Sequence, residues 1–447
     1  MTQGPDRERV RTLTGREEAR FASERPRSVA LLNRARASMP RGVPMGWHAT
    51  SYSHVPIFAA EGRGARFRDV DGHEYSDFNI ADMATFCGHA PEPVVEAVAA
   101  RISAGHQFLL PTEDAVWVAE ELARRWMLPK WQFTLSASQA NVEAIRAARA
   151  ATGRDKVLMF DGKYHGHFDE GLVELRDGRL EPELRGVPAD AAGKVRIVQW
   201  NDLPAVEEAL AMRDVALALL EPVSTNNVGL LVPEDGFHSG LRELTRRAGT
   251  LLAHDETHTL VTGPGGLVRE WGLEPDIVTL GKSVGGGVPL GAYGMAEEIA
   301  SVLEGSVGMH GEVATGGTLF GNALSMAAAR AALGEVLTGS AYERTAKLGA
   351  RLADGLEAAA GRAGLPWTIH RLFARSGTTF GPRMPRNAVE ATEVQDPLLV
   401  RCLRVFLANR GVWEAIPGAG PTVSVPATEE DVDRYVDGFG AWLDEIA

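Results

Sequence analysis

The sequence predicts an α/β protein in which helices cover both faces of a mostly parallel sheet. The main observation is that short apolar runs alternate with amphipathic helical segments from about Trp131 onward. A second is that polar or small residues follow several of these runs, and ligands of parallel sheets bind beyond the carboxyl ends of the strands. A third is Lys282, which stands directly after one apolar run and shortly before three glycines.

The expected elements follow the hydrophobic periodicity in chain order. A helix over 28–39 and a hairpin over 66–75 with a turn at Asp71-Gly72 are followed by helices over 93–104 and 114–126. The spacing then predicts sheet strands at 132–135, 156–160, 195–199, 215–220, 250–254 and 276–280, with helices at 141–152, 203–212 and 237–248. Long helices over 323–337 and 342–363 lead into a tail of short strands and helices.

Four segments are expected from this pattern. Residues 1–28 are polar and charged and are predicted to form a flexible N-terminal arm. Residues 29–85 form the N-terminal part of a small domain, 86–322 form the large domain, and 323–447 form the C-terminal part of the small domain.

Composition narrows the class of protein. The 447 residues are 45% hydrophobic and 23% charged, which is ordinary for a soluble globular chain. The net charge of −13 argues against a nucleic-acid partner. No apolar run is long enough to cross a bilayer, and the N-terminus lacks the apolar core of a secretory signal. Because Cys87 and Cys402 offer neither a disulfide framework nor metal-ligand spacing, we expect a cytoplasmic protein without a metal.

Lys282 is one of six lysines in the chain, so a solubilising surface role is a poor explanation for it. An amine beside the side-chain-free backbone of 285–287 suits a flat ligand. Gly281-Lys282-Ser283 also resembles the end of a phosphate-binding P-loop. That motif requires a glycine five residues before Gly281, where Asp276 stands, so nucleotide binding of this kind is excluded.

Four other segments place polar side chains where strands end. They are Ser136-Ala137-Ser138-Gln139-Ala140, Gly162-Lys163-Tyr164-His165-Gly166-His167, Glu221-Pro222 with Asn226 following, and His254-Asp255-Glu256-Thr257-His258. The first combines hydroxyls with the N–H groups of a helix start and suits a phosphate, although a plain N-cap is the alternative. The second offers a ring that could stack on a planar cofactor; a metal is the weaker interpretation, because no carboxylate motif completes a ligand set. For Glu256, a structural ion pair is an equal alternative.

Together these parts are an anion pocket, a stacking ring, a strand-end acid and an isolated lysine. Pyridoxal 5'-phosphate (PLP) needs this combination: a Schiff base to the lysine, and a carboxylate that keeps the ring nitrogen protonated. Opposite charges at close range favour the charged form of each group. The released lysine amine can then move a proton between substrate and cofactor. We therefore predict PLP as the cofactor.

Two motifs carry a family resemblance. TLGKSVGGGVPLGAYG around Lys282 and RDKVLMFDGKYHGHFD at residues 154–169 resemble class III PLP-dependent aminotransferases of fold type I, especially the glutamate-1-semialdehyde aminomutase branch. The similarity runs from about Pro40 to the C-terminus. It implies that 86–322 is the large PLP-binding domain with a mostly parallel seven-stranded sheet, and that both termini build a smaller α+β domain.

The resemblance also implies a role for individual side chains. Lys282 would be the Schiff-base lysine, and both Lys282 and Asp255 would be catalytic. The cofactor contacts that it implies are Asp255 on the pyridine nitrogen, Tyr164 on the ring with His165 beside it, Ser136, Ala137 and Ser138 around the phosphate, Asn226 at the phenolic oxygen, and Thr257 in place of a valine that packs on the ring. Thr318 matches a threonine that reaches the cofactor phosphate of a neighbouring subunit, which implies a homodimer.

Departures from the family concern the substrate. Leu260-Val261-Thr262 stands where the aminomutase branch carries an arginine, and by simple counting His48 replaces a second, carboxylate-binding arginine. Histidine cannot reproduce the two-pronged pairing of arginine with a carboxylate. Trp47 and His48 are therefore candidate substrate residues together with Glu221. A substrate carboxylate could instead be held by Arg375, Arg383 or Arg386, and the alternative for Trp47 and His48 is simple packing and solvent exposure.

The main prediction is a PLP-dependent aminotransferase that moves an amino group from an amine or amino acid donor to a keto or aldehyde acceptor by a ping-pong mechanism. The alternatives are an aminomutase of the glutamate-1-semialdehyde type, a racemase and, less favoured, a non-catalytic PLP-binding regulatory protein. The missing arginines argue against the aminomutase. The intact Lys282 and Asp255 argue against the regulatory protein. The expected partners are small molecules and a second copy of the chain, with no nucleic acid and no membrane.

Overall fold

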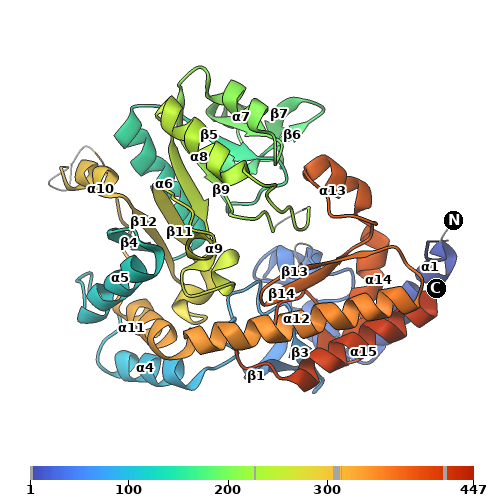
Figure 1. Ribbon diagram of the computed structural model, residues 1–447. Coiled ribbons are helices and arrows are strands. Elements are labelled where there is room, and N and C mark those ends of the chain that lie inside the picture. The colour runs from blue at the N-terminus through green and yellow to red at the C-terminus, as the bar shows by residue number, and fades with distance from the viewer. Residues whose placement is uncertain (1–3, 226–227, 306–312, 314, 416–419, 447) are drawn as a thin grey trace. The chain divides into compact units, whose positions relative to one another are not determined.

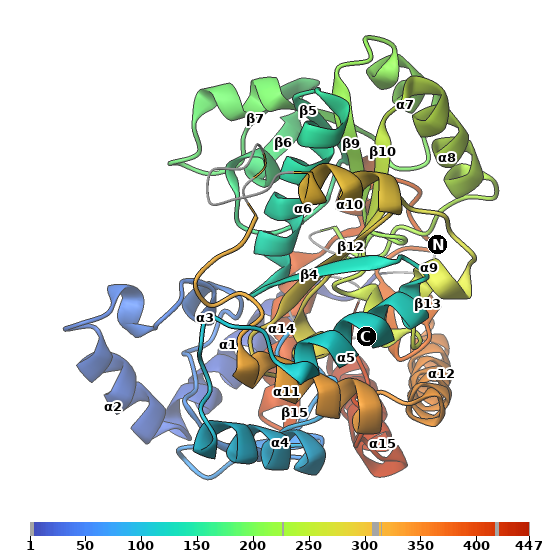
Figure 2. The same ribbon diagram turned by 90° about the vertical axis from the view of Figure 1, so that its left-hand side faces the viewer.

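The structure is a computed structural model that describes residues 4–225, 228–305, 313, 315–415 and 420–446. The chain divides into two compact units (Figures 1 and 2). Unit 1 comprises Met1–Pro91, Glu343–Met384 and Glu393–Ala447, and unit 2 comprises Glu92–Tyr342 and Pro385–Thr392. The expected division placed 323–342 in the small domain. It belongs to unit 2 because α11 (Ala323–Ala331) packs on α4 (Glu92–Ser103) and α5 (Glu113–Trp126).

A seven-stranded sheet forms the centre of unit 2, in the order β4-β12-β11-β10-β9-β5-β8. Its strands are β4 (Lys130–Thr134), β5 (Lys156–Phe160), β8 (Val195–Val198), β9 (Val215–Leu220), β10 (Leu251–Asp255), β11 (Ile277–Leu280) and β12 (Gly291–Met295). Only β12 runs antiparallel to its neighbours β4 and β11, and the other adjacent pairs are parallel. The predicted mostly parallel sheet is thus confirmed, and β5 and β9 match their predicted limits.

Helices cover both faces of this sheet. Its helices are α6 (Ala137–Thr152), α7 (Leu203–Leu210), α8 (Phe237–Ala248), α9 (Gly266–Glu270) and α10 (Glu297–Glu304). Because successive strand residues point to opposite faces, Val157 and Met159 of β5 pack with α6, whereas Leu158 and Phe160 pack with α7 and α8. All six residues of β9 are buried, as expected for a parallel strand covered on both sides.

Shorter elements complete unit 2. They are a hairpin of β6 (Val173–Arg176) and β7 (Arg179–Pro182), and the short helical turns η2 (Asp169–Leu172), η3 (Ala189–Lys194), η4 (Thr259–Val261), η5 (Lys282–Gly285) and η6 (Ala332–Val336). The helix expected over 323–337 is α11 followed by η6, which is a π-helical turn.

Unit 1 is built from both ends of the chain. Its four-stranded sheet has the order β1-β2-β3-β15, from β1 (Ala59–Arg63), β2 (Arg66–Asp69), β3 (Glu74–Asp77) and β15 (Val412–Trp413). The predicted hairpin is the antiparallel pair β2–β3. A second hairpin joins β13 (Thr368–Leu372) and β14 (Arg375–Thr379). The helices of this part are α2 (Pro26–Ala35), η1 (Pro40–Gly42), α3 (Trp47–Thr50), α14 (Pro397–Ala408) and α15 (Glu429–Ile446), while α12 (Gly339–Arg362) and α13 (Ala388–Val394) each span a boundary between the units.

The prediction of a flexible arm over 1–28 is wrong for most of these residues, because α1 (Arg7–Ser23) is a regular helix. Asp6 caps it by accepting from the N–H groups of Glu8 and Arg9 at 2.9 and 3.2 Å. The helix packs on α14 and α15, with Val10 and Phe21 fully buried. Its many charged residues lie mostly on the opposite face. The high overall charge of the segment therefore hid the single row of residues that the helix buries.

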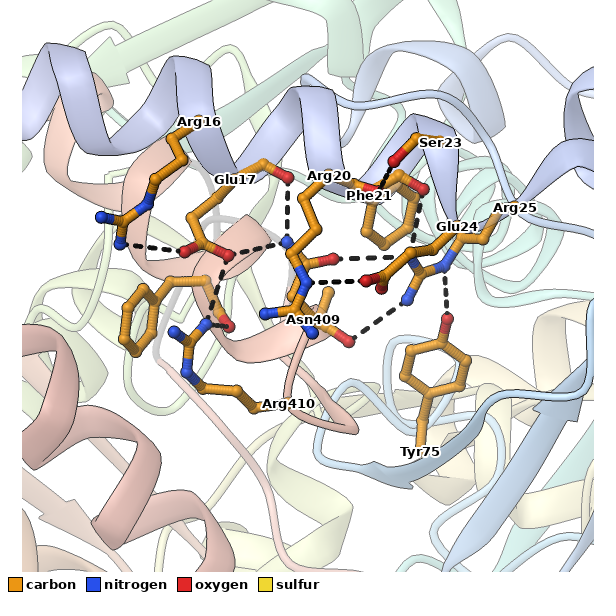
Figure 3. Close-up of polar contacts among 12 residues, drawn as sticks. Arg16, Glu17, Arg20, Phe21, Ser23, Glu24, Arg25, Tyr75, Asn409 and Arg410 are labelled. Atoms are coloured by element: carbon orange, nitrogen blue, oxygen red, sulfur yellow. Dashed lines mark hydrogen bonds and ion pairs between the residues drawn. The ribbon is translucent and has the colours of Figure 1, made fainter.

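Polar contacts also fix α1 within unit 1 (Figure 3). Glu17 accepts from the Asn409 side chain at 2.8 Å and from Arg410 at 3.3 Å. Arg25 lies over the ring of Phe21 and donates to the hydroxyl of Tyr75 at 2.8 Å. A buried carboxylate and guanidinium with such partners hold the C-terminal half of α1 and the residues that follow it. Among the described residues, no helix combines the length and apolar character needed to cross a membrane.

Candidate active site

The strand-end residues singled out in unit 2 gather at the carboxyl edge of the seven-stranded sheet. Asp255 ends β10, Lys282 follows β11 after one glycine, and His165 lies in the loop after β5. Ser136 precedes α6, which starts beyond the carboxyl end of β4. Parallel strands bring their carboxyl ends to one edge, so these sequence-distant groups meet there.

Asp255 is a buried carboxylate at this edge that accepts several hydrogen bonds. It is 3% exposed, and its Oδ2 lies 2.9 Å both from the Asn141 Nδ2 and from the His165 Nδ1. Its Oδ1 accepts from the Thr257 N–H at 3.1 Å. Burial alone would raise the pKa of this carboxyl, but His165, Thr257 and Asn141 outweigh it and lower the pKa to about 2. Asp255 therefore stays ionised at neutral pH and can hold a protonated ring nitrogen.

Asn141 is a site residue that the sequence did not reveal. It is fully buried on α6, donates to the Asp255 carboxylate and also donates to the His165 carbonyl at 2.7 Å. Its Oδ1 accepts from the Thr279 hydroxyl of β11 at 2.6 Å. The one available signal was an asparagine, a poor helix former, in the second turn of an alanine-rich helix.

Lys282 begins the short turn η5 and adopts a left-handed backbone conformation, with φ of 54°. A residue with a side chain pays a conformational cost of about 1 kcal/mol there, and such strain is concentrated at functional sites. Gly281 allows the close approach that places it: a Cβ at this position would lie 2.9 Å from the backbone nitrogen of Ala137. Lys282 is thus held directly beside the start of α6.

The start of α6 has the form expected of an anion site. Ser136 caps the helix by accepting from the Gln139 N–H at 3.3 Å. Ser138 Oγ accepts from the His167 N–H at 3.1 Å. Gly166, with φ of 114°, packs so closely that a Cβ would lie 2.6 Å from the Ser138 Cα. Both the N-cap and the phosphate interpretation of 136–138 fit these contacts, since a capped helix start still directs N–H groups outward.

His165 and Thr257 each leave one buried polar atom at this edge. The His165 Nε2 and the Thr257 Oγ1 have no hydrogen-bond partner within the described residues. Tyr164, next to His165, is half-buried in the loop after β5. Polar atoms of this kind carry a cost unless a ligand or water meets them, so they indicate where a ligand binds.

His258 stands in a segment that the sequence singled out, but the sequence assigned it no role. Its Nε2 contacts the Nζ of Lys282, and its Nδ1 lies 2.9 Å from the Thr225 Oγ1. Glu221, a candidate substrate residue, accepts the Thr225 hydroxyl at 2.6 Å and lies 3.7 Å from His258. The structure thus places Glu221 in a buried chain of contacts behind Lys282.

Glu256 proves to be structural, although not as an ion pair. It is fully buried and accepts from the Thr259 hydroxyl and from the N–H groups of Leu267 and Val268, the latter two at 3.1 and 2.5 Å. These N–H groups belong to the first turn of α9, so the carboxyl caps that helix. Burial is the main influence and raises the pKa of Glu256 to about 7, against these hydrogen bonds.

A pH-dependent stability follows from Glu256. Because its folded pKa of about 7 lies above the ordinary value for glutamate, its contribution is complete at pH 4 and is lost as the pH rises through 7. Between pH 5 and 8, we expect the wild type to lose up to about 3 kcal/mol of unfolding free energy relative to Glu256→Gln. Urea unfolding of both proteins at each pH measures this difference, and parallel curves would contradict it.

The remaining candidates lie elsewhere in unit 2, in unit 1 or outside the described residues. Thr318 is exposed in unit 2, and its carbonyl accepts from the Gln107 side chain at 2.6 Å. Trp47 and His48, on α3, are exposed residues of unit 1. Asn226 lies outside the described residues. Of the three arginines suggested for a substrate carboxylate, Arg375 and Arg383 belong to unit 1, and Arg386 forms an exposed ion pair with Glu234.

The residues of unit 2 fit PLP. A carboxylate that is ionised although buried suits a pyridinium nitrogen, and a lysine amine stands at the end of the adjacent strand. A helix start backed by the close approach of Gly166 and Gly281 suits a phosphate. Two partnerless buried atoms, on His165 and Thr257, lie in the loops that flank these groups.

Known proteins support this assignment. The class-III aminotransferase family matches residues 47–395. Glutamate-1-semialdehyde 2,1-aminomutase of Akkermansia muciniphila is 36% identical over 421 residues, which cover 92% of this chain and 97% of that protein. A crystal structure of a glutamate-1-semialdehyde aminomutase from Pseudomonas aeruginosa PAO1 is 39% identical, with a TM-score of 0.95 over the full length of both chains. A lysine-to-alanine variant of such an enzyme has been solved in complex with PMP.

A third relative is a transaminase. The crystal structure of an omega-transaminase from Sphaerobacter thermophilus is 32% identical, with a TM-score of 0.85, and covers 94% of this chain and 97% of that one. The predicted family, the fold type I architecture and the PLP cofactor are therefore confirmed. The chain belongs to the class-III aminotransferases and is a PLP-dependent enzyme.

Proposed function

We propose that this enzyme moves an amino group within one small substrate, as a glutamate-1-semialdehyde 2,1-aminomutase does. The observation that carries this proposal is the similarity to the aminomutases of Akkermansia and Pseudomonas, which extends over nearly the whole of each chain. This similarity favours the aminomutase, which was an alternative in the sequence analysis, over the main prediction, which was an aminotransferase with a separate donor and acceptor. The reaction would transfer the amino group between neighbouring carbons 2 and 1.

The residues of unit 2 provide what this chemistry requires. Bound PLP would supply an electron sink for the bond that breaks at the substrate carbon. Asp255 would hold the positive charge of the ring nitrogen, while Asn141 and His165 fix its carboxylate at 2.9 Å each. Lys282 would take the proton from one carbon and return it to another, because its amine is the mobile base at this edge. Ser138 and the Ala137 N–H would bind the phosphate.

A second candidate is transfer to a separate acceptor, as in the predicted aminotransferase. The observation that favours it is the pair of missing arginines, with His48 and the Leu260-Val261-Thr262 stretch at the positions where the aminomutase branch carries them. A pocket without them would hold the single carboxylate of glutamate-1-semialdehyde poorly. Trp47, His48 and Glu221 are the side chains that we propose for substrate selection in either case.

Turnover on a single substrate separates the candidates. We would incubate the PLP-loaded enzyme with glutamate-1-semialdehyde alone and follow by NMR the isomer with the amino group on carbon 1. Conversion without any added amine supports the aminomutase. Conversion only with an added donor, together with incorporation of ¹⁵N from that donor, establishes the aminotransferase. Inversion without migration identifies a racemase, and a protein whose cofactor absorbance no amine changes is the regulatory alternative.

We propose further that the enzyme acts as a cytoplasmic homodimer in which Thr318 reaches the cofactor phosphate of the neighbouring subunit. The exposure of Thr318 in the single chain and the resemblance of its GGTLFGN segment to the family motif support the proposal. Light scattering should give a mass of twice 48.0 kDa. A monomer that binds PLP with full activity would contradict it.

A further inference from the structure

A buried chain of polar side chains leads away from the amine of Lys282. It runs from the Lys282 Nζ to the His258 Nε2, from the His258 Nδ1 to the Thr225 Oγ1 at 2.9 Å, and from the Thr225 hydroxyl to the Glu221 carboxylate at 2.6 Å. His258, Thr225 and Glu221 are 4%, 1% and 4% exposed. The three elements that contribute are the ends of β9, β10 and β11, all within unit 2.

The direction of the hydrogen bonds fixes the state of the imidazole. The Thr225 hydroxyl has one hydrogen, and it is directed at a carboxylate oxygen that can only accept while ionised. The Thr225 oxygen must therefore accept from His258, which places a hydrogen on Nδ1. The Nε2 of the neutral ring then presents its lone pair to the amine of Lys282.

Glu221 can balance a charge on this ring. Burial alone would raise the pKa of the Glu221 carboxyl, but its interactions with His258 and Thr225 hold that pKa below its ordinary value. The carboxylate lies 3.7 Å from the His258 Nδ1. The titratable or charged groups that face this arrangement are Lys282 from η5, Glu221 from the end of β9 and Asp255 from β10.

We propose that His258 is the proton acceptor of Lys282, oriented by Thr225 and charge-balanced by Glu221. The Lys282 ammonium passes one proton to the His258 Nε2, which leaves a neutral amine beside an imidazolium, and the same proton returns when the amine next needs it. A neutral amine is the form that reacts with a carbonyl and that accepts a proton from carbon.

The hydrogen-bonded side chains from Lys282 to Glu221 would have the same function in both candidate reactions, because each reaction begins and ends at the Lys282 amine. Their function does not rest on which substrate the enzyme uses. The arrangement also explains why a histidine with both ring nitrogens engaged stands three residues after Asp255, where packing alone would accept an apolar side chain.

The test measures the Lys282 amine in cofactor-free protein. Cyanate carbamylates neutral amines, and mass spectrometry of the modified peptides gives the rate at Lys282 relative to exposed Lys194 and Lys347 as a function of pH. The decisive variant is His258→Gln, whose amide can keep both hydrogen bonds but cannot take up a proton. We expect its Lys282 profile to move to higher pH by at least about one unit, with a rate at pH 7 at least about tenfold lower.

A matched pair of variants tests the role of Thr225 in orienting His258. Thr225→Ser keeps the hydroxyl, and Thr225→Val keeps the shape without it. We expect the serine variant to follow the wild-type profile and the valine variant to move toward that of His258→Gln. In the loaded enzyme, kcat of His258→Gln should fall about ten- to a hundredfold at pH 7 and recover as the pH rises, because hydroxide then removes the proton.

Two results would overturn the proposal. One is a Lys282 carbamylation profile that coincides in the wild type and in His258→Gln. The other is a kcat that is reduced to the same degree at every pH, which would show that the histidine only packs against the lysine. Neither readout depends on the identity of the substrate carbon, and the carbamylation readout needs no turnover, so failure of the proposed aminomutase reaction would leave this test intact.

Discussion

Replacing Lys282 with alanine is expected to lower kcat by at least about 10⁴-fold, because the reaction then lacks both its covalent anchor and its mobile base. The visible absorbance band of lysine-linked PLP should disappear as well. The fold should survive, since the side chain is only partly buried at the rim of the sheet and makes no hydrophobic core contact. Steady-state kinetics and an absorbance spectrum of the purified variant measure both effects.

Two controls make this result specific. Lys282→Arg keeps the positive charge but cannot give a neutral amine, so it should be as inactive as the alanine variant. Lys347→Ala removes an exposed lysine of unit 1 and should leave kcat and the spectrum unchanged. Turnover above 1% of the wild-type rate in Lys282→Ala, with the absorbance band retained, would refute the role of this lysine.

The fold of unit 2 was predictable because burial leaves a local signature there. A parallel strand covered by helices on both faces is an unbroken apolar run, so the limits of β5 and β9 could be read from the sequence alone. The helix α1 has no such run. Its buried residues recur once per turn between charged ones, and its packing partners are α14 and α15, near the other end of the sequence. Only the folded chain brings these together.

The same distinction separates the site residues that the sequence predicted from those that it did not. Lys282 and Asp255 could be found because a charged residue at the end of an apolar run needs an explanation. Asn141 and His258 could not, because the partners that define them are 114 and 24 positions away. Their meaning depends on which loops share the carboxyl edge of the sheet. Sequence patterns mark strand ends but do not state which polar side chains face one another there.

Substrate choice was predicted least well. The missing arginines led to an aminotransferase as the main interpretation, whereas the aminomutases of Akkermansia and Pseudomonas match nearly the whole chain. The two reactions use the same cofactor, lysine and acid, so most of the chain carries no information that separates them. A few side chains decide, and Trp47 and His48 are in unit 1, while the chemistry of Lys282 is in unit 2. Two local departures, at His48 and at residues 260–262, are weak evidence against similarity over nearly the whole chain.

The second large effect is expected for Asp255→Asn. Asparagine cannot carry the charge that holds a protonated ring nitrogen, so kcat should fall on the order of 10³-fold, as when one preorganised electrostatic partner is removed from an active site. The amide also misfits its neighbours: both Asn141 and His165 reach the same Oδ2, and an NH₂ group there would face another donor. Steady-state kinetics with saturating PLP measure the loss, and a PLP titration separates it from weakened cofactor binding.

The pH dependence of the wild type gives an independent check of this role. Because the pKa of Asp255 is held at about 2, the stabilising effect of its charge is present above the ordinary range for aspartate and is lost only as the pH falls toward 2. The activity of the wild type should therefore show no titration of Asp255 between pH 5 and 9. A transition in that range that disappears in Asp255→Asn would contradict an ionised acid.

A control separates loss of charge from loss of fold. Asp276→Asn removes another aspartate of unit 2, at the opposite end of β11, where Arg242 pairs with both carboxylate oxygens at 2.7 and 2.8 Å. That variant should lose stability, because a two-pronged ion pair is broken, yet keep kcat within about twofold of the wild type, because the pair lies away from the carboxyl edge. If Asp255→Asn instead kept full kcat while Asp276→Asn lost it, the electrostatic centre of the site would not be Asp255. If both variants lost kcat only in proportion to the unfolded fraction, Asp255 would be a structural acid, and the charge on the ring nitrogen would need another source.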